Sequence, residues 1–107
     1  MRRRYSELGR FSDPSLLILS SLASGPKHGY AMIQDIEAFS GTRLEPGTLY
    51  GAMARLELRG WIAPLEAKDR RRPYELTAAG GQALRAQLPT LQRVAATGLK
   101  RLGMTSS

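Results

Sequence analysis

Few residues in this sequence could perform catalysis or bind a metal ion. The 107 residues contain one histidine and no cysteine, which excludes cysteine nucleophiles, thiolate zinc sites and multi-histidine metal sites. The sequence has no G-x-S-x-G elbow, no phosphate-binding loop and no paired acidic residues at the ends of elements. We therefore expect the protein not to be an enzyme and to bind no metal or cofactor.

Positive charge is the feature with the clearest chemical use. Sixteen Lys and Arg against nine Asp and Glu give a net charge of +7, which attracts an anionic partner such as nucleic acid or an acidic membrane surface. A protruding group of cations can replace counterions along DNA phosphates; a loop that only improves solubility is the alternative. The candidate contacts are Arg2, Arg3 and Arg4 at the N-terminus, and Lys68, Arg70, Arg71 and Arg72 around Asp69.

The basic stretch at 68–72 follows three predicted helices. Asp13-Pro14 is typical of a helix start, and the first helix then runs through the apolar segment 16–23. The second helix is predicted at about 29–40, with Gly41 as a left-handed stop. The third begins at Pro46 and ends near Gly60. Its predicted core face consists of Leu49, Ala52, Met53 and Leu56.

Two short strands and a long helix are predicted in the rest of the chain. Residues 61–65 and 72–76 have β-like composition and enclose a charged turn. Thr77 is the expected N-cap of a last helix that reaches about residue 102, and Pro89 should kink this helix or split it in two. An apolar stripe along it has spacings of three and four residues. The stripe lacks aromatic residues, so we expect pairing with a second copy of the chain rather than membrane binding. The predicted dimer contacts are Leu84, Leu88, Leu91, Ala95, Leu99 and Leu102.

This order of elements predicts a mainly α fold with a small β-wing: a winged helix-turn-helix followed by a C-terminal dimerisation helix. The expected divisions are a basic arm at 1–12, the winged helix-turn-helix at 13–77, the dimerisation helix at 78–103 and a tail at 104–107. In such a fold the third helix enters a major groove of DNA and the ribbon tip reaches an adjacent groove or the backbone.

Small residues lie on the face of the third helix that points away from its predicted core. Glycine inside a helix is about 1 kcal/mol less favourable than alanine, so Gly51, with Gly47 one turn earlier, indicates close approach of another surface. DNA and a neighbouring helix are the two alternatives. Thr48 could touch a base edge or a phosphate, Arg55 could donate two hydrogen bonds to guanine, and Tyr50 could donate to a phosphate. A solvated Arg55, and a Tyr50 that packs on the second helix, are equally open.

Five strings, in this order and with these gaps, resemble the PadR family of bacterial transcriptional regulators. They are Leu17–Leu22, Gly25–Tyr30, Pro46–Tyr50, Leu56–Ile62 and Arg71–Gly80. The resemblance covers about residues 15–82 and implies a winged helix-turn-helix DNA-binding domain with a C-terminal dimerisation helix. Family members are usually repressors, and a small molecule releases many of them.

The resemblance also implies residue roles. By position, Tyr30, Thr48 and Tyr50 would face the DNA, 70–72 would lie in the wing, and 77–80 would start the dimer helix. Pro73 departs from the family pattern and predicts a shorter second strand. The chain ends soon after its last helix, as in the short-tailed members, so we expect no separate effector domain.

The sequence thus predicts a homodimeric, sequence-specific double-stranded DNA-binding regulator that acts as a repressor. Two-fold symmetry predicts an inverted repeat with half-sites about 10 bp apart or a multiple of that. The alternative is a winged-helix interaction module that docks an acidic protein through the small-residue face of the third helix.

Three further expectations concern an effector, His28 and the location of the protein. A small-molecule effector of unidentified chemistry would use Trp61 or the arm, although packing under the wing is the simpler expectation for Trp61. For His28 we expect a turn position satisfied by nearby backbone rather than a pH switch. Asp13-Pro14 separates the N-terminal arginines from an apolar run of only eight residues, which argues against an export signal or a membrane span. We expect a cytoplasmic protein without a membrane partner.

Overall fold

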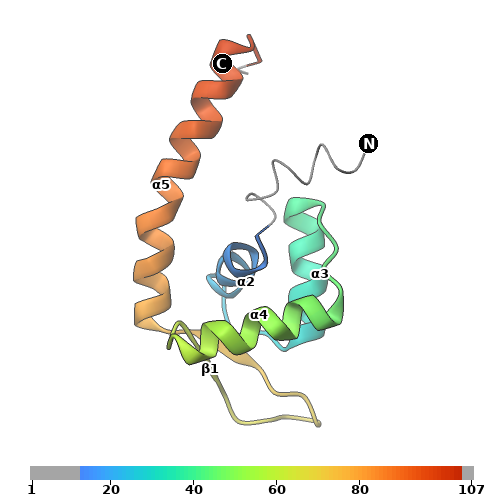
Figure 1. The fold of residues 1–107 in the computed structure, drawn as a ribbon. Coiled ribbons are helices and arrows are strands. Elements are labelled where there is room, and N and C mark those ends of the chain that lie inside the picture. Colours follow the sequence, from blue (N-terminus) through green and yellow to red (C-terminus); the bar gives the residue numbers. More distant parts are fainter. Residues whose placement is uncertain (1–12, 105–107) are drawn as a thin grey trace.

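Four helices and two short strands make up residues 13–104, the part of the chain that the computed structural model describes. In chain order the elements are α2 (Pro14–Leu22), α3 (Gly29–Ser40), α4 (Pro46–Leu58), β1 (Ile62–Pro64), β2 (Tyr74–Leu76) and α5 (Ala78–Arg101), as drawn in Figure 1. The predicted mainly α fold with a small β-wing is confirmed.

The helices begin and end at residues that satisfy free backbone groups. Asp13 caps α2, where its Oδ1 accepts the backbone N–H of Ser15 at 2.8 Å. Gly41 ends α3 with φ of 75°, a left-handed conformation that glycine adopts without strain. Thr77 caps α5, where its Oγ1 accepts the backbone N–H of Gly80 at 3.0 Å. The predicted start of α2, stop of α3 and start of α5 are therefore confirmed.

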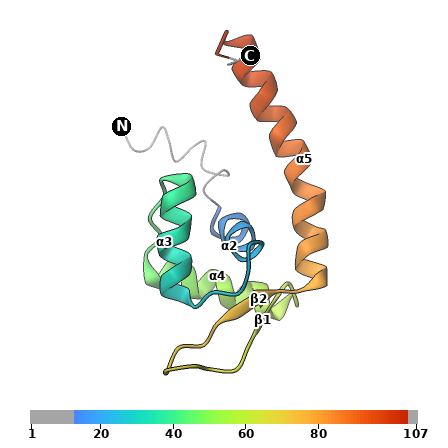
Figure 2. The same cartoon turned by 180° about the vertical axis from the view of Figure 1, so that it is seen from behind.

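Helix α2 occupies the centre of the fold. It contacts α3, α4, α5 and β2, and Figures 1 and 2 show it nearly end-on between α3 and α5, above α4. Central placement explains why α2 is apolar on almost every side. The buried core consists of Leu17, Ile18, Leu19, Leu22, Met32, Ile33, Ile36, Leu44, Leu49, Ala52, Met53, Leu56, Ile62 and Leu84.

The wing is an antiparallel pair in which Ile62 lies opposite Leu76 and Pro64 lies opposite Tyr74. Strand β2 starts directly after Pro73, in agreement with the predicted shortening of this strand. The carbonyl of Pro73 still accepts the N–H of residue 65 at 2.8 Å. Proline is tolerated here because its position in the ribbon requires only an acceptor.

Lys27, which lies before α3, pairs with β2 on the side that does not face β1. The backbone N–H of Lys27 donates to the carbonyl of Tyr74 at 3.1 Å, and the N–H of Tyr74 donates to the carbonyl of Lys27 at 2.9 Å. No side-chain pattern in the sequence predicts this bridge. It joins the wing to the turn between α2 and α3, so the wing is fixed to the helical part by main-chain hydrogen bonds.

Tyr74 also lies close to α4. Burial, and next the negative charge of Glu57, raise the pKa of the Tyr74 hydroxyl above its ordinary value of 10.0, while the positive charge of Arg72 opposes them. The folded protein therefore holds this proton more tightly than the unfolded chain. Its contribution to stability is complete below pH 10 and is lost as the pH rises through the folded pKa.

We therefore expect the wild-type protein to lose stability relative to Tyr74→Phe above about pH 10. The free energy of urea unfolding, measured for both proteins from about pH 9 to pH 11, tests this prediction. Parallel stability curves across this range would contradict it. Glu57→Gln should make this decline smaller and end it at a lower pH, because it removes a charge that disfavours the phenolate in the folded protein.

Helix α5 is continuous across Pro89, so the predicted alternative of a split helix is wrong. Pro89 is exposed, and water can satisfy the carbonyl that lacks its usual donor. Beyond residue 87 the helix leaves the rest of the molecule (Figure 1), and every described residue there except Leu91 is exposed. Leu84, the first residue of the predicted stripe, is instead 6% exposed and belongs to the core of its own chain.

Candidate functional site

The outer face of α4 is open to solvent. We call Gly47, Thr48, Gly51 and Arg55 the α4 ridge; all four residues are exposed. A Cβ added to Gly47 would meet nothing within 4 Å, and one added to Gly51 would meet only the Nη1 atom of Arg55, at 3.8 Å. Within the described part of the chain, no other helix approaches Gly51. The predicted alternative of a neighbouring helix of the same chain is therefore wrong.

Tyr50 also belongs to α4, but its ring lies against α3 and outside the α4 ridge. Its ring lies against the backbone of Gly29, the first residue of α3: a Cβ on Gly29 would lie 2.8 Å from Cζ of Tyr50 and 3.0 Å from Cε1. Of the two alternatives for Tyr50, packing on the second predicted helix, which is α3, is therefore observed. The side chain of Tyr50 is nevertheless 54% exposed, and that of Tyr30 is 56% exposed at the start of α3. Both rings thus remain accessible to a partner.

The wing tip is a two-residue turn that projects below α4 in Figures 1 and 2. The backbones of Lys68 and Arg71 exchange two hydrogen bonds of 2.8 Å. Between them, Asp69 has φ of 52° and Arg70 has φ of 66°. Positive φ at both central residues is the feature of a type I′ hairpin turn, which ordinarily favours Asn-Gly. An arginine at the second of these positions is therefore conformationally unfavourable.

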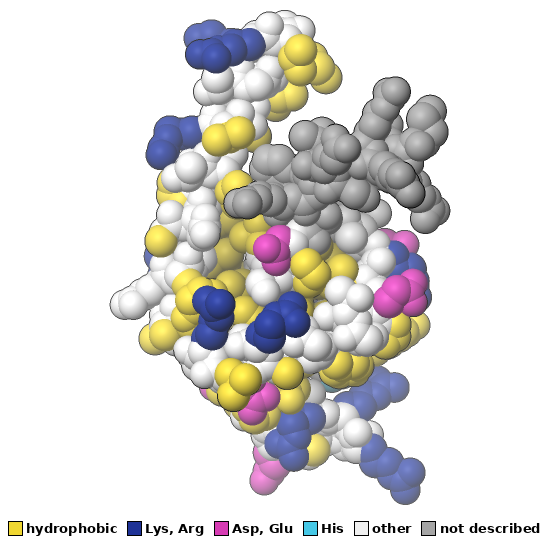
Figure 3. All heavy atoms as spheres, in the orientation of Figure 1, with side chains coloured by type: hydrophobic (Ala, Val, Ile, Leu, Met, Phe, Trp, Pro, Cys, Tyr) yellow, Lys and Arg dark blue, Asp and Glu magenta, His cyan; other side chains and the backbone are white. Residues whose placement is uncertain are grey.

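Two of the four wing cations have polar contacts within the described part of the protein, and two do not. Arg72 donates from Nη1 to the carbonyl of Leu65 at 2.8 Å, and Nη1 of Arg71 lies 3.4 Å from Nε2 of His28. Lys68 and Arg70 make no side-chain hydrogen bond or ion pair with any residue of the described range. These two are the wing cations most available to an external anion. Figure 3 shows Lys and Arg side chains extending from the wing at the bottom of the molecule.

His28 lies between the wing and α3. Its Nδ1 accepts the backbone N–H of Ala31 at 3.4 Å, so it caps α3. This confirms the predicted turn role.

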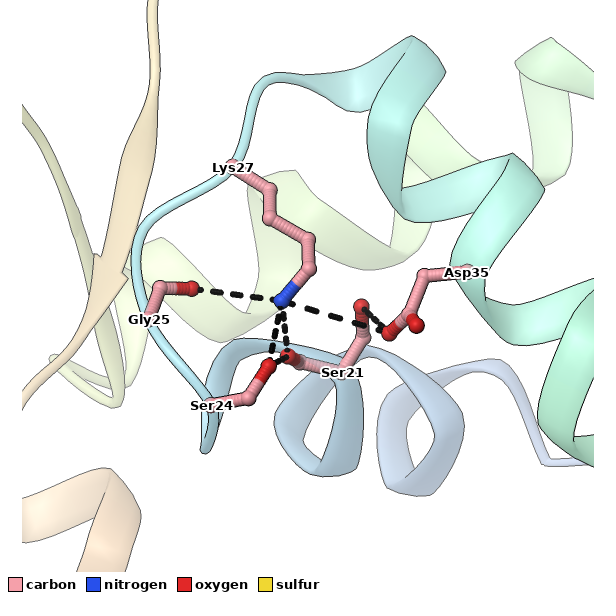
Figure 4. A network of polar contacts seen from close by, with 5 residues as sticks. All are labelled: Ser21, Ser24, Gly25, Lys27 and Asp35. Carbon is pink, nitrogen blue, oxygen red and sulfur yellow. Dashed lines mark hydrogen bonds and ion pairs between the residues drawn. The ribbon is translucent and has the colours of Figure 1, made fainter.

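Lys27 is a cation outside the set of predicted contact residues. Its Nζ donates to the carbonyl of Ser21 at 2.6 Å and to Oγ of Ser24 at 2.7 Å, and lies 3.9 Å from Oδ2 of Asp35 (Figure 4). Oγ of Ser21 donates to the same carboxylate oxygen at 2.7 Å. Lys27 therefore joins the end of α2 to α3, and its backbone holds the wing. It positions the site rather than offering a free charge.

Trp61 precedes β1 and is partly buried against the core, as its predicted packing role requires. The guanidinium of Arg59 lies 5.2 Å from the centroid of its ring. Trp61, Arg59 and Arg55 also line a cavity of about 700 Å³ between α2, α4 and α5. Arg55 is thus shared between this cavity and the α4 ridge.

The predicted DNA contacts of the N-terminal arm, Arg2, Arg3 and Arg4, lie outside the residues that the structure describes. Within residues 13–104 no group of three or more His, Asp or Glu side chains could hold a metal ion. In the same range, no helix has the length and apolar character that crossing a membrane requires.

A family model described as the transcriptional regulator PadR-like family matches residues 18–86. A curated protein from Streptomyces fradiae, described as an uncharacterized 37.1 kDa protein in transposon TN4556, is 48% identical over 85 residues. The match covers 79% of this chain and 25% of that protein, so the chain spans about a quarter of the length of this relative.

Solved structures also resemble this fold. A transcriptional regulator from Clostridium thermocellum superimposes with a TM-score of 0.74 at 26% identity, covering 89% of this chain and 94% of the other. A PadR family transcriptional regulator from Eggerthella lenta superimposes with a TM-score of 0.72 at 30% identity, covering 98% of this chain and 93% of the other. The match therefore extends from the winged helix into α5.

Proposed function

This chain belongs to the PadR-like family of transcriptional regulators, which bind DNA and are not enzymes, and we propose that it is a sequence-specific repressor. As a homodimer it binds an inverted repeat in double-stranded DNA. The α4 ridge enters the major groove, and the wing contacts a neighbouring groove or the phosphate backbone. Its site of action is the cytoplasm, where its operator is accessible.

The observation that carries this proposal is the open α4 ridge beside a projecting basic wing. A helix without side chains at Gly47 and Gly51 allows DNA to approach its backbone closely. Thr48 and Arg55 flank these glycines and can reach base edges or phosphates. At the wing tip, Lys68 and Arg70 have no partner among residues 13–104, so they can pair with phosphates without first breaking a contact in that range.

Homodimer formation is supported by the exposed apolar residues of α5. Leu88 is 41% exposed, Leu99 43% and Leu102 73%, and nothing in the described chain covers them. A stripe with near-heptad spacing is suited to a helix of a second copy. Because Leu84 is buried in the core, we place the start of this contact at Leu88. It then continues through Leu91 and Ala95 to the end of α5.

Selection of bound fragments from random duplex DNA tests the proposal. We expect an inverted repeat whose half-sites are about 10 bp apart or a multiple of that. Affinity for the selected site should fall steeply with salt, as expected when roughly 6–10 phosphates are neutralised. Failure to retain any duplex at near-physiological salt would overturn the proposal and favour docking of an acidic protein.

The wing tip provides a separate prediction. Arg70→Gly should reduce the slope of log affinity against log salt by about one, because one phosphate contact is lost. It should also raise the free energy of unfolding by about 0.5–1 kcal/mol, since glycine adopts positive φ without strain. Fluorescence anisotropy at several salt concentrations and urea unfolding measure the two effects.

Arg70→Gln is the matched control, because it removes the charge but keeps a side chain at positive φ. It should reproduce the loss in salt slope without the gain in stability. If both variants keep the wild-type slope, Arg70 does not contact a phosphate.

A further inference from the structure

His28 and Arg71 bring two hydrogen-bond donors together between the wing and α3. Nδ1 of His28 accepts the backbone N–H of Ala31, and this bond places the hydrogen of the neutral imidazole on Nε2. Nη1 of Arg71 lies 3.4 Å from Nε2, and a guanidinium has only donors. The two nitrogens therefore do not satisfy each other. Among residues 13–104, no carbonyl or carboxylate accepts from either side chain.

An open hollow lies beside this pair of donors. Its volume is about 520 Å³, and its walls are formed by His28, Lys68, Asp69, Arg71 and Pro73. Proline supplies the only apolar side chain of this wall, so an apolar ligand would bury little surface here. Two cations against one carboxylate make the formal charge of the wall positive. The hollow is therefore suited to a small, polar anionic group.

The hollow has the place at which a helix-turn-helix protein meets the DNA backbone. In such proteins the helix that precedes the recognition helix crosses the backbone, and α3 precedes α4. Figures 1 and 2 show the wing tip below the first turn of α3. Gly29, the residue after His28, contacts the ring of Tyr50 on α4. The donor pair is thus next to the junction of the wing, α3 and the helix that carries the α4 ridge.

We propose that His28 and Arg71 jointly bind a single phosphate group, and that in the complex with DNA this group belongs to the backbone beside the wing. The two unesterified oxygens of a backbone phosphate each accept one bond, from Nε2–H of His28 and from Nη1–H of Arg71. The assignment to DNA rests on the proposed function, whereas binding of a phosphate group does not.

The capping bond of His28 gives this contact a second effect. The bond to Ala31 holds the imidazole on α3, while Arg71 belongs to the wing. One phosphate between them therefore fixes the wing and α3 relative to the same point of the DNA backbone. Asp69 is the group of the wall that opposes an anion, so Asp69→Asn should strengthen phosphate binding.

Nuclear magnetic resonance of the free protein tests the site without DNA. His28 is the only histidine, so its ring nitrogens give one pair of ¹⁵N signals, which report the nitrogen that carries the hydrogen in the neutral ring. We expect this nitrogen to be Nε2. Sodium phosphate should shift its signal saturably, sodium chloride at equal ionic strength should not, and Arg71→Gln should weaken the binding severalfold. Hydrogen on Nδ1, or the same response to both salts, would overturn the proposal.

Two substitutions of His28 separate its contact from its capping role. Asparagine has an acceptor near the place of Nδ1 and is a favoured N-cap, but it has no donor near the place of Nε2. Glutamine reaches the place of Nε2 with its amide and is a poor cap. We expect His28→Asn to keep the stability of the wild type and to bind the selected duplex about tenfold more weakly. His28→Gln should be less stable and keep most of the affinity. Affinity that follows stability in both variants would show a structural role only and would overturn the proposal.

A double variant tests whether His28 and Arg71 share one phosphate. Arg71→Gln alone should also weaken duplex binding about tenfold. Combined with His28→Asn, the total loss should be clearly smaller than the product of the two single losses, because both groups hold the same phosphate. Arg70→Gln is the matched control: its loss should multiply with that of His28→Asn, since Arg70 contacts a different phosphate. Losses that multiply for Arg71 as well would refute the shared phosphate.

The source of the phosphate is decided with modified duplexes, in which one backbone phosphate at a time is replaced by a neutral methylphosphonate. At one position in each half-site, the wild type should lose about tenfold in affinity and His28→Asn much less. If no position behaves in this way although inorganic phosphate binds at Nε2, the site holds a free anion and the assignment to DNA is refuted. If no duplex is bound at all, the proposed function fails, while the titration with sodium phosphate still decides the phosphate site.

Discussion

Gly80→Ala is expected to lower the free energy of unfolding by about 3 kcal/mol, one of the two largest effects predicted for this protein. A Cβ at Gly80 would collide with the carbonyl oxygen of Trp61, and would lie 2.9 Å from its carbonyl carbon and 2.9 Å from Cδ1 of Leu76. Two of these three atoms are backbone atoms, which cannot move without displacing the wing. The gain of about 1 kcal/mol in helix propensity is too small to compensate.

Urea or thermal unfolding at a fixed protein concentration measures this effect, because a dimer would make stability depend on concentration. Gly81→Ala is the matched control in the same helical turn. Its nearest atom is Nη1 of Arg85, at 3.4 Å, which is the free end of a flexible side chain. We expect this variant to be as stable as the wild type or slightly more stable. Equal stability of the two alanine variants would refute the close packing at Gly80.

The close approach of Gly80 to the backbone of Trp61 lies where α5 leaves the wing, and two hydrogen bonds of Thr77 hold the same junction. Oγ1 of Thr77 donates to the carbonyl of Gly60 at 2.6 Å, and the N–H of Thr77 donates to the carbonyl of Trp61 at 3.0 Å. The end of α4, the start of the wing and the start of α5 are thus joined within a few residues. In the proposed dimer, the geometry of the α5 contact would be transmitted to α4 through this joint, and the close packing at Gly80 would help to fix the relative position of the two α4 helices.

Local signals in the sequence were sufficient to locate the elements. Asp13-Pro14, Gly41 and Thr77 each act through a hydrogen bond or a backbone angle within about three residues, and each occurs where it was predicted. The outward position of Gly51 also follows from helical periodicity alone. For the same reason, the ridge could be predicted residue by residue.

Contacts between distant segments were not predictable in this way. The Lys27–Tyr74 bridge consists of main-chain hydrogen bonds, which no side-chain pattern encodes. Leu84 has the spacing of the exposed stripe and is nevertheless buried, because the first turns of α5 pack on α2 before the helix leaves the body. Pro89 was expected to kink α5 or split it in two, and the split did not occur, because a single missing donor on an exposed helix leaves a carbonyl that water can satisfy. The cavity beside Trp61 requires three helices to be placed at once, which periodicity does not determine.

Gly51→Leu is expected to raise the stability of the protein and to lower its affinity for DNA. Because the ridge is open at this position, the substitution should raise the free energy of unfolding by about 0.5–1 kcal/mol through helix propensity. The same side chain would stand between the α4 backbone and DNA. We therefore expect affinity for the selected duplex to fall by at least about tenfold, equivalent to about 1.4 kcal/mol. Urea unfolding and fluorescence anisotropy measure the two quantities.

Gly51→Ala provides the graded control, because alanine gives a similar gain in stability with a much smaller side chain. Its DNA affinity should lie between those of the wild type and the leucine variant. Gly98→Ala changes another exposed helical glycine with open space around it, at the far end of α5, and should stabilise the protein without altering the contact at the ridge.

The outcomes at position 51 decide the prediction. If the alanine and leucine variants bind the duplex equally well, DNA does not approach this face of α4, and the glycines of the ridge have another purpose. If affinity instead decreases with the size of the side chain while stability does not, close approach of DNA is the reason why α4 contains a glycine that weakens it as a helix.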